Sequence, residues 1–95
     1  MAQVIWTAQA TKDIERIAEY VAQESEQYAS LLVTKLYARA QPLRQFPLMS
    51  RMVPEKEDPS VRELIEGNYR IIYEVLSEDI VLIETVRHSA QNFRY

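Results

Sequence analysis

The only glycine of this 95-residue chain, Gly67, joins two apolar runs and limits how they can pair. The runs read VRELIE from Val61 to Glu66 and YRIIYEVL from Tyr69 to Leu76. Gly67 and the adjacent Asn68 are residue types that accept the positive φ of a tight hairpin turn. The pattern therefore predicts two antiparallel strands joined by a two-residue loop.

A third β-prone run, from Ile80 to Arg87, follows after the polar residues 77–79. With the two earlier runs it predicts an antiparallel meander. Arg62, Arg70 and Arg87 lie inside these runs, and an arginine within a strand has to be paired, exposed or functional. Paired guanidinium donors suit phosphate or carboxylate, so three arginines in one region are a candidate anion-binding set.

Each of these arginines can instead be a structural residue, paired with one of the acids of the same strands: Glu63, Glu74 or Glu84. The length of the hairpin loop decides whether Arg62 and Arg70 can cooperate. A two-residue loop pairs Arg62 with Tyr73 and places Arg70 on the opposite face, whereas a three-residue loop reverses that relation. Both arrangements are compatible with the sequence.

The first half of the chain predicts one short strand and two helices. Gln3 to Thr7 is β-prone, and Thr7 can cap a helix that starts at Ala8. Ser25 can cap a second helix, which either kinks at Pro42 or ends before it. Apolar residues recur every three or four positions in both helices: Ala10, Ile14, Ile17, Ala18 and Val21, then Ala29, Leu32, Val33, Leu36, Ala40 and Leu43.

The segment from Phe46 to Ser60 contains three prolines and no sustained periodicity, which predicts a loop. Neither the helices nor the sheet can bury an apolar face alone. We therefore expect one domain, residues 1–95, with an α+β two-layer fold. In it, an N-terminal strand and a helical hairpin pack on an antiparallel sheet.

Composition excludes several classes of site. The chain has no cysteine and one histidine, so neither a thiolate site nor a histidine cluster is available, and we expect no metal and no cofactor. No segment approaches the ~20 apolar residues of a membrane span, and the N-terminus does not resemble a signal peptide. We expect a cytoplasmic protein without a membrane partner. The net charge of -3 argues against a protein that mainly binds nucleic-acid backbone.

The end of the chain is the exception to this acidity, since residues 87–95 carry two arginines, one histidine and no acid. His88 is most simply a surface or hydrogen-bonded residue, although its ordinary pKa near ~6.5 also permits proton transfer. Phe93 and Tyr95 are candidates for docking on the domain or on a partner. The other tyrosines are explained by packing with a solvated hydroxyl.

The order of these elements, with VREL, GNYRIIYEV and a terminal VRH, resembles the RelE/ParE superfamily of bacterial toxins. The resemblance covers nearly the whole chain. It implies the same fold and the toxin role in a type II toxin–antitoxin system of the plasmid-stabilization kind. The toxin would be neutralised by a cognate antitoxin that wraps around it, with a toxin–antitoxin heterotetramer as one possible assembly.

Two branches of the superfamily imply different targets. RelE-like members are ribosome-dependent mRNA endonucleases, and by that resemblance Arg70 would contact the scissile phosphate, with Arg87 and His88 as the other catalytic positions. ParE-like members bind DNA gyrase and are not nucleases. In that branch Arg62, Arg70, Arg87, Phe93 and Tyr95 would bind the target or the antitoxin.

Two departures from the nuclease pattern favour the ParE-like branch. The loop before the hairpin contains Glu55, Glu57 and Asp58 around a single lysine, where nucleases often place lysines. Phe93 stands near the position of a catalytic tyrosine and cannot exchange a proton. An inactive toxin fold that serves as a binding module is a third reading, compatible with the same departures.

Overall fold

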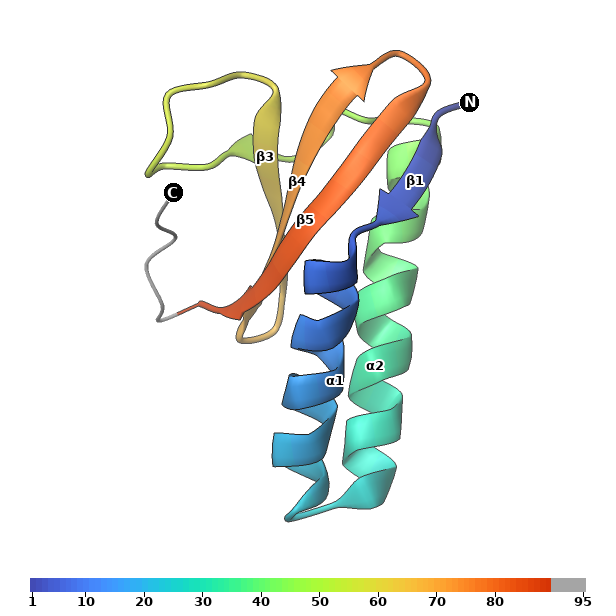
Figure 1. Ribbon diagram of the computed structural model, residues 1–95, viewed down its shortest axis with the longest axis vertical. Coiled ribbons are helices and arrows are strands. Elements are labelled where there is room, and N and C mark those ends of the chain that lie inside the picture. The colour runs from blue at the N-terminus through green and yellow to red at the C-terminus, as the bar shows by residue number, and fades with distance from the viewer. Residues whose placement is uncertain (90–95) are drawn as a thin grey trace.

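The computed structural model describes residues 1–89, as an α+β arrangement of two helices beside a twisted sheet (Figure 1). The elements in chain order are β1 (Gln3–Trp6), α1 (Ala8–Ala22), α2 (Glu26–Ala40), the 3₁₀ helix η1 (Gln41–Arg44), β2 (Arg51–Met52), β3 (Val61–Glu66), β4 (Tyr69–Ser77) and β5 (Ile80–His88). This confirms the predicted mixed fold, with the N-terminal strand and helical hairpin preceding the meander.

The five strands form one sheet in the order β1-β5-β4-β3-β2. All neighbours are antiparallel except β1, which joins the edge of the sheet parallel to β5. The sequence predicted β1 as a strand but did not place it. The two residues of β2 lie inside the segment predicted as a loop, where Arg51 pairs with Glu63 and Met52 with Arg62.

The hairpin around Gly67 has the predicted two-residue loop. Glu66 pairs with Tyr69 and Arg62 with Tyr73. Gly67 has a φ of 57°, and among residues 1–89 no non-glycine residue has a positive φ. Asn68, the second residue type expected to accept a positive φ, therefore does not adopt the left-handed conformation.

Both helices begin at the predicted caps. The Thr7 side chain accepts a hydrogen bond from the Ala10 amide, and that of Ser25 accepts one from the Tyr28 amide. Of the two outcomes predicted for the second helix, the structure has the end before Pro42. The chain continues as η1, where proline occupies one of the first positions and its missing N–H removes no helical hydrogen bond.

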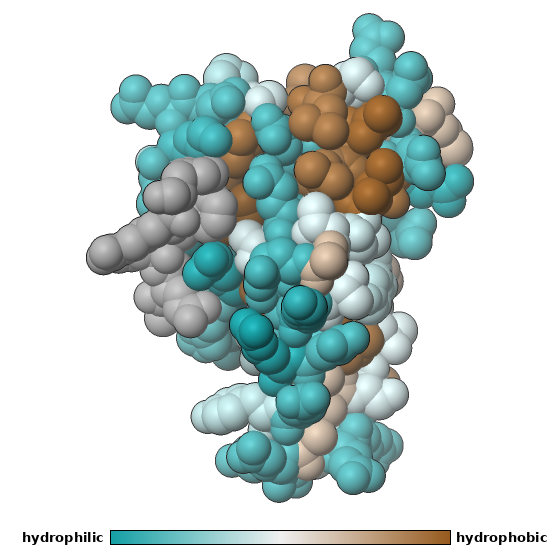
Figure 2. Space-filling model, viewed as in Figure 1, coloured by the Kyte–Doolittle hydropathy of each residue, from teal (hydrophilic) through white to brown (hydrophobic). Residues whose placement is uncertain are grey.

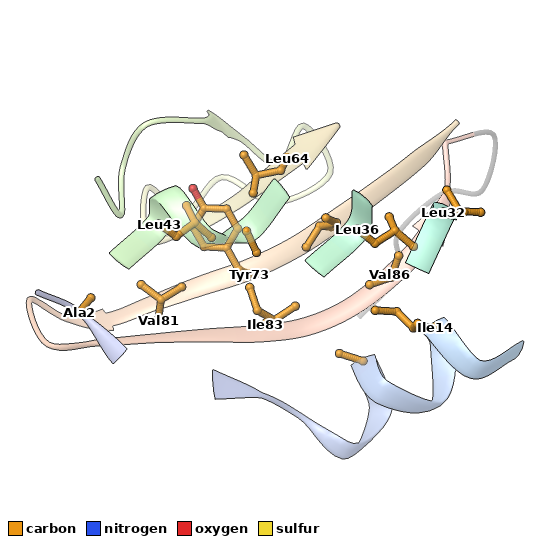
Figure 3. Packing of buried hydrophobic residues seen from close by; sticks show 13 residues of the cluster. Ala2, Ile14, Leu32, Leu36, Leu43, Leu64, Tyr73, Val81, Ile83 and Val86 are labelled. Atoms are coloured by element: carbon orange, nitrogen blue, oxygen red, sulfur yellow. The ribbon is translucent and has the colours of Figure 1, made fainter. Parts of the chain in front are cut away.

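The two helices cover one face of the sheet, and side chains from both layers meet between them (Figure 3). The buried residues of this core are Ala2, Ala10, Ile14, Leu32, Leu36, Ala40, Leu43, Leu64, Ile71, Tyr73, Val81, Ile83 and Val86. A smaller cluster of Val53, Val61 and Ile72 lies on the opposite face, which we call the open face. There the loop after β2 supplies Val53 as its cover.

Within residues 1–89, no helix has the length and apolar character needed to cross a membrane.

Candidate functional site

Arg70 lies at the centre of a buried charge cluster on the open face. Its Nε donates to Glu63 Oε1 at 2.7 Å, and its Nη1 and Nη2 donate to the two carboxylate oxygens of Glu55, each at 2.8 Å. Glu63 Oε2 also accepts from Arg51 Nε at 2.5 Å. The Glu63 side chain is 0% exposed and that of Arg70 7%, so this is a desolvated network. Glu55, at 27%, and Arg51, at 63%, are its accessible members.

Arg70 is thus a paired structural residue, which was the alternative to an anion-binding role in the sequence analysis. The hydrogen bonds that Arg70 donates to Glu55 and Glu63 raise the pKa of Arg70 further above its already high value and outweigh the effect of burial. The bidentate contact with Glu55 has the form that a guanidinium makes with phosphate or carboxylate ligands. An incoming anion would therefore have to displace Glu55 before it could bind Arg70 in that way.

Arg87 and His88, the predicted last-strand pair, point to opposite faces of the sheet. Arg87 is directly opposite Arg70 across β4 and β5, and therefore shares the open face with it. His88 pairs with Tyr69 on the helix-facing side, where the two rings make an edge-to-face contact with centroids 5.7 Å apart. The three predicted catalytic positions are therefore not gathered on one face.

A hollow of about 540 Å³ lies on the helix-facing side, between α1 and the ends of β4 and β5. The polar and ring residues that line it come from both layers: Gln9, Asp13, Arg16, Tyr20, Tyr69, Arg87 and His88. Arg87 borders it from β5, although its side chain starts from the open face. Burial raises the pKa of Tyr69, with Tyr28 and Tyr20 adding to the shift, so its hydroxyl stays a neutral donor at neutral pH. The hollow combines the Arg16 guanidinium with an imidazole and tyrosines, and its carboxylate, Asp13, already accepts from Thr85 and Val86. This set suits an acidic or aromatic side chain of a partner.

The sequence did not predict that Arg16 and Tyr20 would join His88. The sequence explained Tyr20 by packing, yet Tyr20 is exposed at the rim of the hollow. The signal for it was present, because the i, i+4 spacing of Arg16 and Tyr20 places both on one side of α1. What the sequence lacked was the position of β5 relative to that helix.

Arg62 does not join the other arginines, so of the two arrangements that the sequence left open, the structure has the one that separates Arg62 from Arg70. It lies on the helix-facing side, opposite to Arg70, as the two-residue loop requires. Its Nη1 donates to the Ser50 carbonyl at 2.8 Å and its Nε to the Pro59 carbonyl at 2.9 Å. Arg62 thus holds together the two ends of the loop that carries β2.

The predicted binding residues Phe93 and Tyr95 lie outside the described residues. Within the part of the chain that the structure describes, no group of three or more acidic or histidine side chains is placed to hold a metal ion. The surface viewed in Figure 2 shows apolar residues gathered over one end of the sheet, around β1 and β5, and a mainly polar helical hairpin. On those strands Ile5 is exposed and lies beside Leu82 in the register.

Comparison with known proteins gives consistent matches over nearly the whole chain. The model of the family described as the ParE toxin of the type II toxin–antitoxin system parDE matches residues 4–93. Toxin RelE2 of Caulobacter vibrioides is 30% identical over 91 residues, which cover 96% of this chain and 99% of that protein.

Solved structures share the fold at lower identity. A chain of the chromosomal ParDE toxin–antitoxin system of P. aeruginosa superposes with a TM-score of 0.76 at 24% identity, covering 93% of this chain and 96% of that one. A chain of the E. coli DinJ-YafQ toxin–antitoxin complex gives a TM-score of 0.53 at 16% identity, covering 94% and 93%.

Proposed function

The chain belongs to the ParE toxin family of type II toxin–antitoxin systems, within the RelE/ParE superfamily, and on this premise we propose that it arrests growth by binding DNA gyrase. The observation that carries the choice of target is the charge cluster at Arg70. The arginine that a nuclease would direct at the scissile phosphate is bound by Glu55 and Glu63. A binding toxin has no need of a phosphate-directed cation there.

Charge supports the same choice. A ribosome-dependent nuclease has to approach a dense array of phosphates, and a net charge of -3 opposes that approach over long distances. The separation of Arg70 and His88 onto opposite faces also removes the shared site that proton transfer beside a bound phosphate would require. A function in protein binding requires neither attraction to phosphates nor a site shared by Arg70 and His88.

The proposal assigns separate surfaces to the target and to the antitoxin. The helical hairpin, α1 and α2, extends beyond the sheet (Figure 1) and is the proposed gyrase-facing surface together with the basic end of the chain. The cognate antitoxin is the second proposed partner. We assign to the antitoxin the open face, where Ile5 is exposed, and the hollow between α1 and the ends of β4 and β5.

The test is a pair of parallel assays on the purified chain. We expect inhibition of gyrase supercoiling that is relieved by the cognate antitoxin, while cell-free translation continues. Unaffected supercoiling at every stoichiometry, together with arrested translation, would contradict the gyrase proposal.

A second candidate, ribosome-dependent mRNA cleavage, is favoured by the exposed imidazole of His88 beside Tyr69, and by the 30% identity to a toxin named RelE2. Under this function His88→Ala and Arg70→Ala would each abolish mRNA cleavage in translating ribosomes. Full toxicity of both variants, with folded protein, would count decisively against it.

The remaining alternative is an inactive toxin fold that only binds. Induction of the chain without antitoxin separates it from both toxin functions. We expect growth to stop within a few generations and to resume when the antitoxin is supplied. Unimpeded growth at high expression of folded protein would favour the inactive binding module.

A further inference from the structure

A second apolar surface lies between the loop that joins η1 to β2 and the end of β4, on the side of the sheet that the helices occupy. We call it the Phe46–Met49 groove. It has a volume of about 580 Å³ and is lined by Phe46, Pro47, Leu48, Met49, Val75, Ser77 and Glu78. Phe46 is 60% exposed, Leu48 57% and Met49 40%, so three large apolar side chains in four residues face solvent.

The loop that carries these side chains is fixed from beneath. The hydroxyl of Tyr73, a fully buried residue, donates to the Pro47 carbonyl at 3.0 Å and accepts from Ser50 Oγ. Arg62 Nη1 donates to the Ser50 carbonyl at 2.8 Å. Because these contacts hold the backbone of residues 47–50 toward the protein, the apolar side chains are presented outward and binding need not order the loop backbone.

The rim of the groove is acidic. Glu78 lines it, and Asp79 follows in the same turn between β4 and β5. A second copy of this chain docked symmetrically on the groove would bring Glu78 of both copies toward each other, on a protein whose net charge is already -3. A partner with apolar side chains flanked by a lysine or arginine satisfies both the groove and its rim.

The apolar character of the groove favours a permanent partner over a transient one, because long-lived interfaces bury more hydrophobic surface. We propose that the Phe46–Met49 groove binds an amphipathic segment of the cognate antitoxin, with apolar side chains in the groove and a basic side chain against Glu78. This proposal rests on the toxin–antitoxin function proposed above. In it, Tyr73 and Arg62 are positioning residues that hold the groove in shape.

The test compares two variants in calorimetric titration with the purified full-length cognate antitoxin. The double variant Phe46→Ser, Leu48→Ser removes the groove's apolar side chains, and we expect its dissociation constant to rise at least ~10-fold. Leu31→Ser on α2 is the matched control, since Leu31 is 53% exposed outside the groove. Its dissociation constant should stay at the wild-type value. Equal affinity of the double variant and the wild type would overturn the proposal.

The charge of the rim gives an independent variant that leaves the apolar side chains in place. Glu78→Lys should weaken antitoxin binding about 5-fold at low salt, with a smaller difference at high salt, since the rim pair is solvent-exposed. Glu24→Lys, at the far end of the hairpin, carries the same charge change and should leave the affinity closer to the wild type. If the two substitutions weaken antitoxin binding equally, the effect comes from net charge alone, which would contradict a contact at the rim.

Two further readouts identify any other occupant. If the double variant binds antitoxin normally but no longer inhibits gyrase, the groove belongs to the target. If it abolishes a concentration-dependent dimer of the toxin in sedimentation, with antitoxin affinity unchanged, the groove is a self-association surface. Both results overturn the proposal. If the wild type does not inhibit gyrase but its antitoxin affinity depends on the groove, the inference stands and the gyrase assignment fails.

Discussion

At the scale of single residues, Glu63 decides what Arg70 can do. Its fully buried carboxylate accepts from both Arg70 and Arg51, which satisfies both carboxylate oxygens. Desolvating the charges of Glu63 and Arg70 is costly, and the pair is stable only while each keeps its partners. The same contacts make the arginine a poor phosphate ligand, so the structural and functional roles of Arg70 compete.

Removal of the Glu63 charge should therefore destabilise the protein strongly. We expect Glu63→Gln to lower the free energy of unfolding by about 3 kcal/mol, since it leaves a buried guanidinium without its closest counter-charge. Glu55→Gln is the matched control at the accessible end of the same cluster, and solvent should limit its cost to about 1 kcal/mol. Urea denaturation measures both values. Equal losses would show that burial of Glu63 adds nothing to its pairing.

Glu84, at an irregularity in the pairing of β4 and β5, should make stability depend on pH. Burial raises its pKa above the ordinary value of 4.5, and the nearby Glu74 adds to the shift. An acid whose pKa is raised in the folded state destabilises that state once it ionises. Below pH 4.5 Glu84 is protonated in both the folded and the unfolded state, so it causes no such loss. The loss of stability develops as the pH rises above 4.5.

Glu84→Gln should consequently stabilise the protein at pH 7 by about 0.5 kcal/mol, a modest gain because the side chain is partly solvated. The gain should vanish near pH 4, where the wild-type carboxyl is protonated. Thermal unfolding of both proteins at the two pH values checks the difference. A gain that is equal at both pH values would exclude titration of Glu84 as its cause.

The sequence predicted the hairpin register from a local signal, Gly67 and its neighbour, and this placed Arg62 and Arg70 on opposite faces once the loop length was known. It could not choose among the acids for Arg70, because Glu55 reaches it from a loop 15 residues earlier. The sequence also missed the role of Arg62. Its partners are backbone carbonyls, which carry no signature in the sequence.

At the scale of elements, α1 closes an edge that β1 leaves open. β1 pairs with residues 80–83 of β5 and then turns into the helix, so the backbone of β5 beyond Ile83 needs other partners. Thr7 Oγ1 donates to the Glu84 carbonyl at 3.0 Å, and Asp13 Oδ2 accepts from the Val86 amide at 3.0 Å. The side chains of the α1 N-cap and of α1 itself thus continue the hydrogen bonding that a strand would provide.

Asp13→Ala should therefore cost about 2 kcal/mol of stability, since it leaves the Val86 amide and the Thr85 hydroxyl without an acceptor that both now use. Asp13→Asn keeps one carbonyl oxygen and should recover about half of the loss. Hydrogen exchange of the Val86 amide reports the site directly and should accelerate in the alanine variant. Unchanged exchange would show that another group protects this amide.

Local patterns predicted the elements that local interactions stabilise. Apolar periodicity and the caps Thr7 and Ser25 predicted both helices, because helical hydrogen bonds join residues four apart. The parallel pairing of β1 with β5 joins residues almost 80 positions apart, and no local pattern encodes it. The sequence also missed β2, whose two residues form a strand only because the edge of β3 is available.

At the scale of the whole molecule, the apolar surface is divided between a covered and an uncovered part. The helices bury one face of the sheet, while the open face and the Phe46–Met49 groove leave Ile5, Phe46 and Leu48 exposed to solvent. The polar hairpin extends away from both, so partners of different chemistry can bind at different ends (Figures 1 and 2). The sequence predicted this two-layer fold but not which apolar residues stay uncovered.

A partner that covers this surface only in the folded state must raise the stability of the toxin. With the cognate antitoxin at 100 times its dissociation constant, linkage adds about 2.7 kcal/mol, which for a domain of this size raises the unfolding midpoint by roughly 10 °C. Fluorescence-monitored melting across a titration measures the rise, which should continue with antitoxin concentration after saturation because the equilibrium follows mass action. The groove variant Phe46→Ser, Leu48→Ser should need more antitoxin for the same rise. A midpoint that stays constant at every antitoxin concentration would contradict binding to the folded toxin.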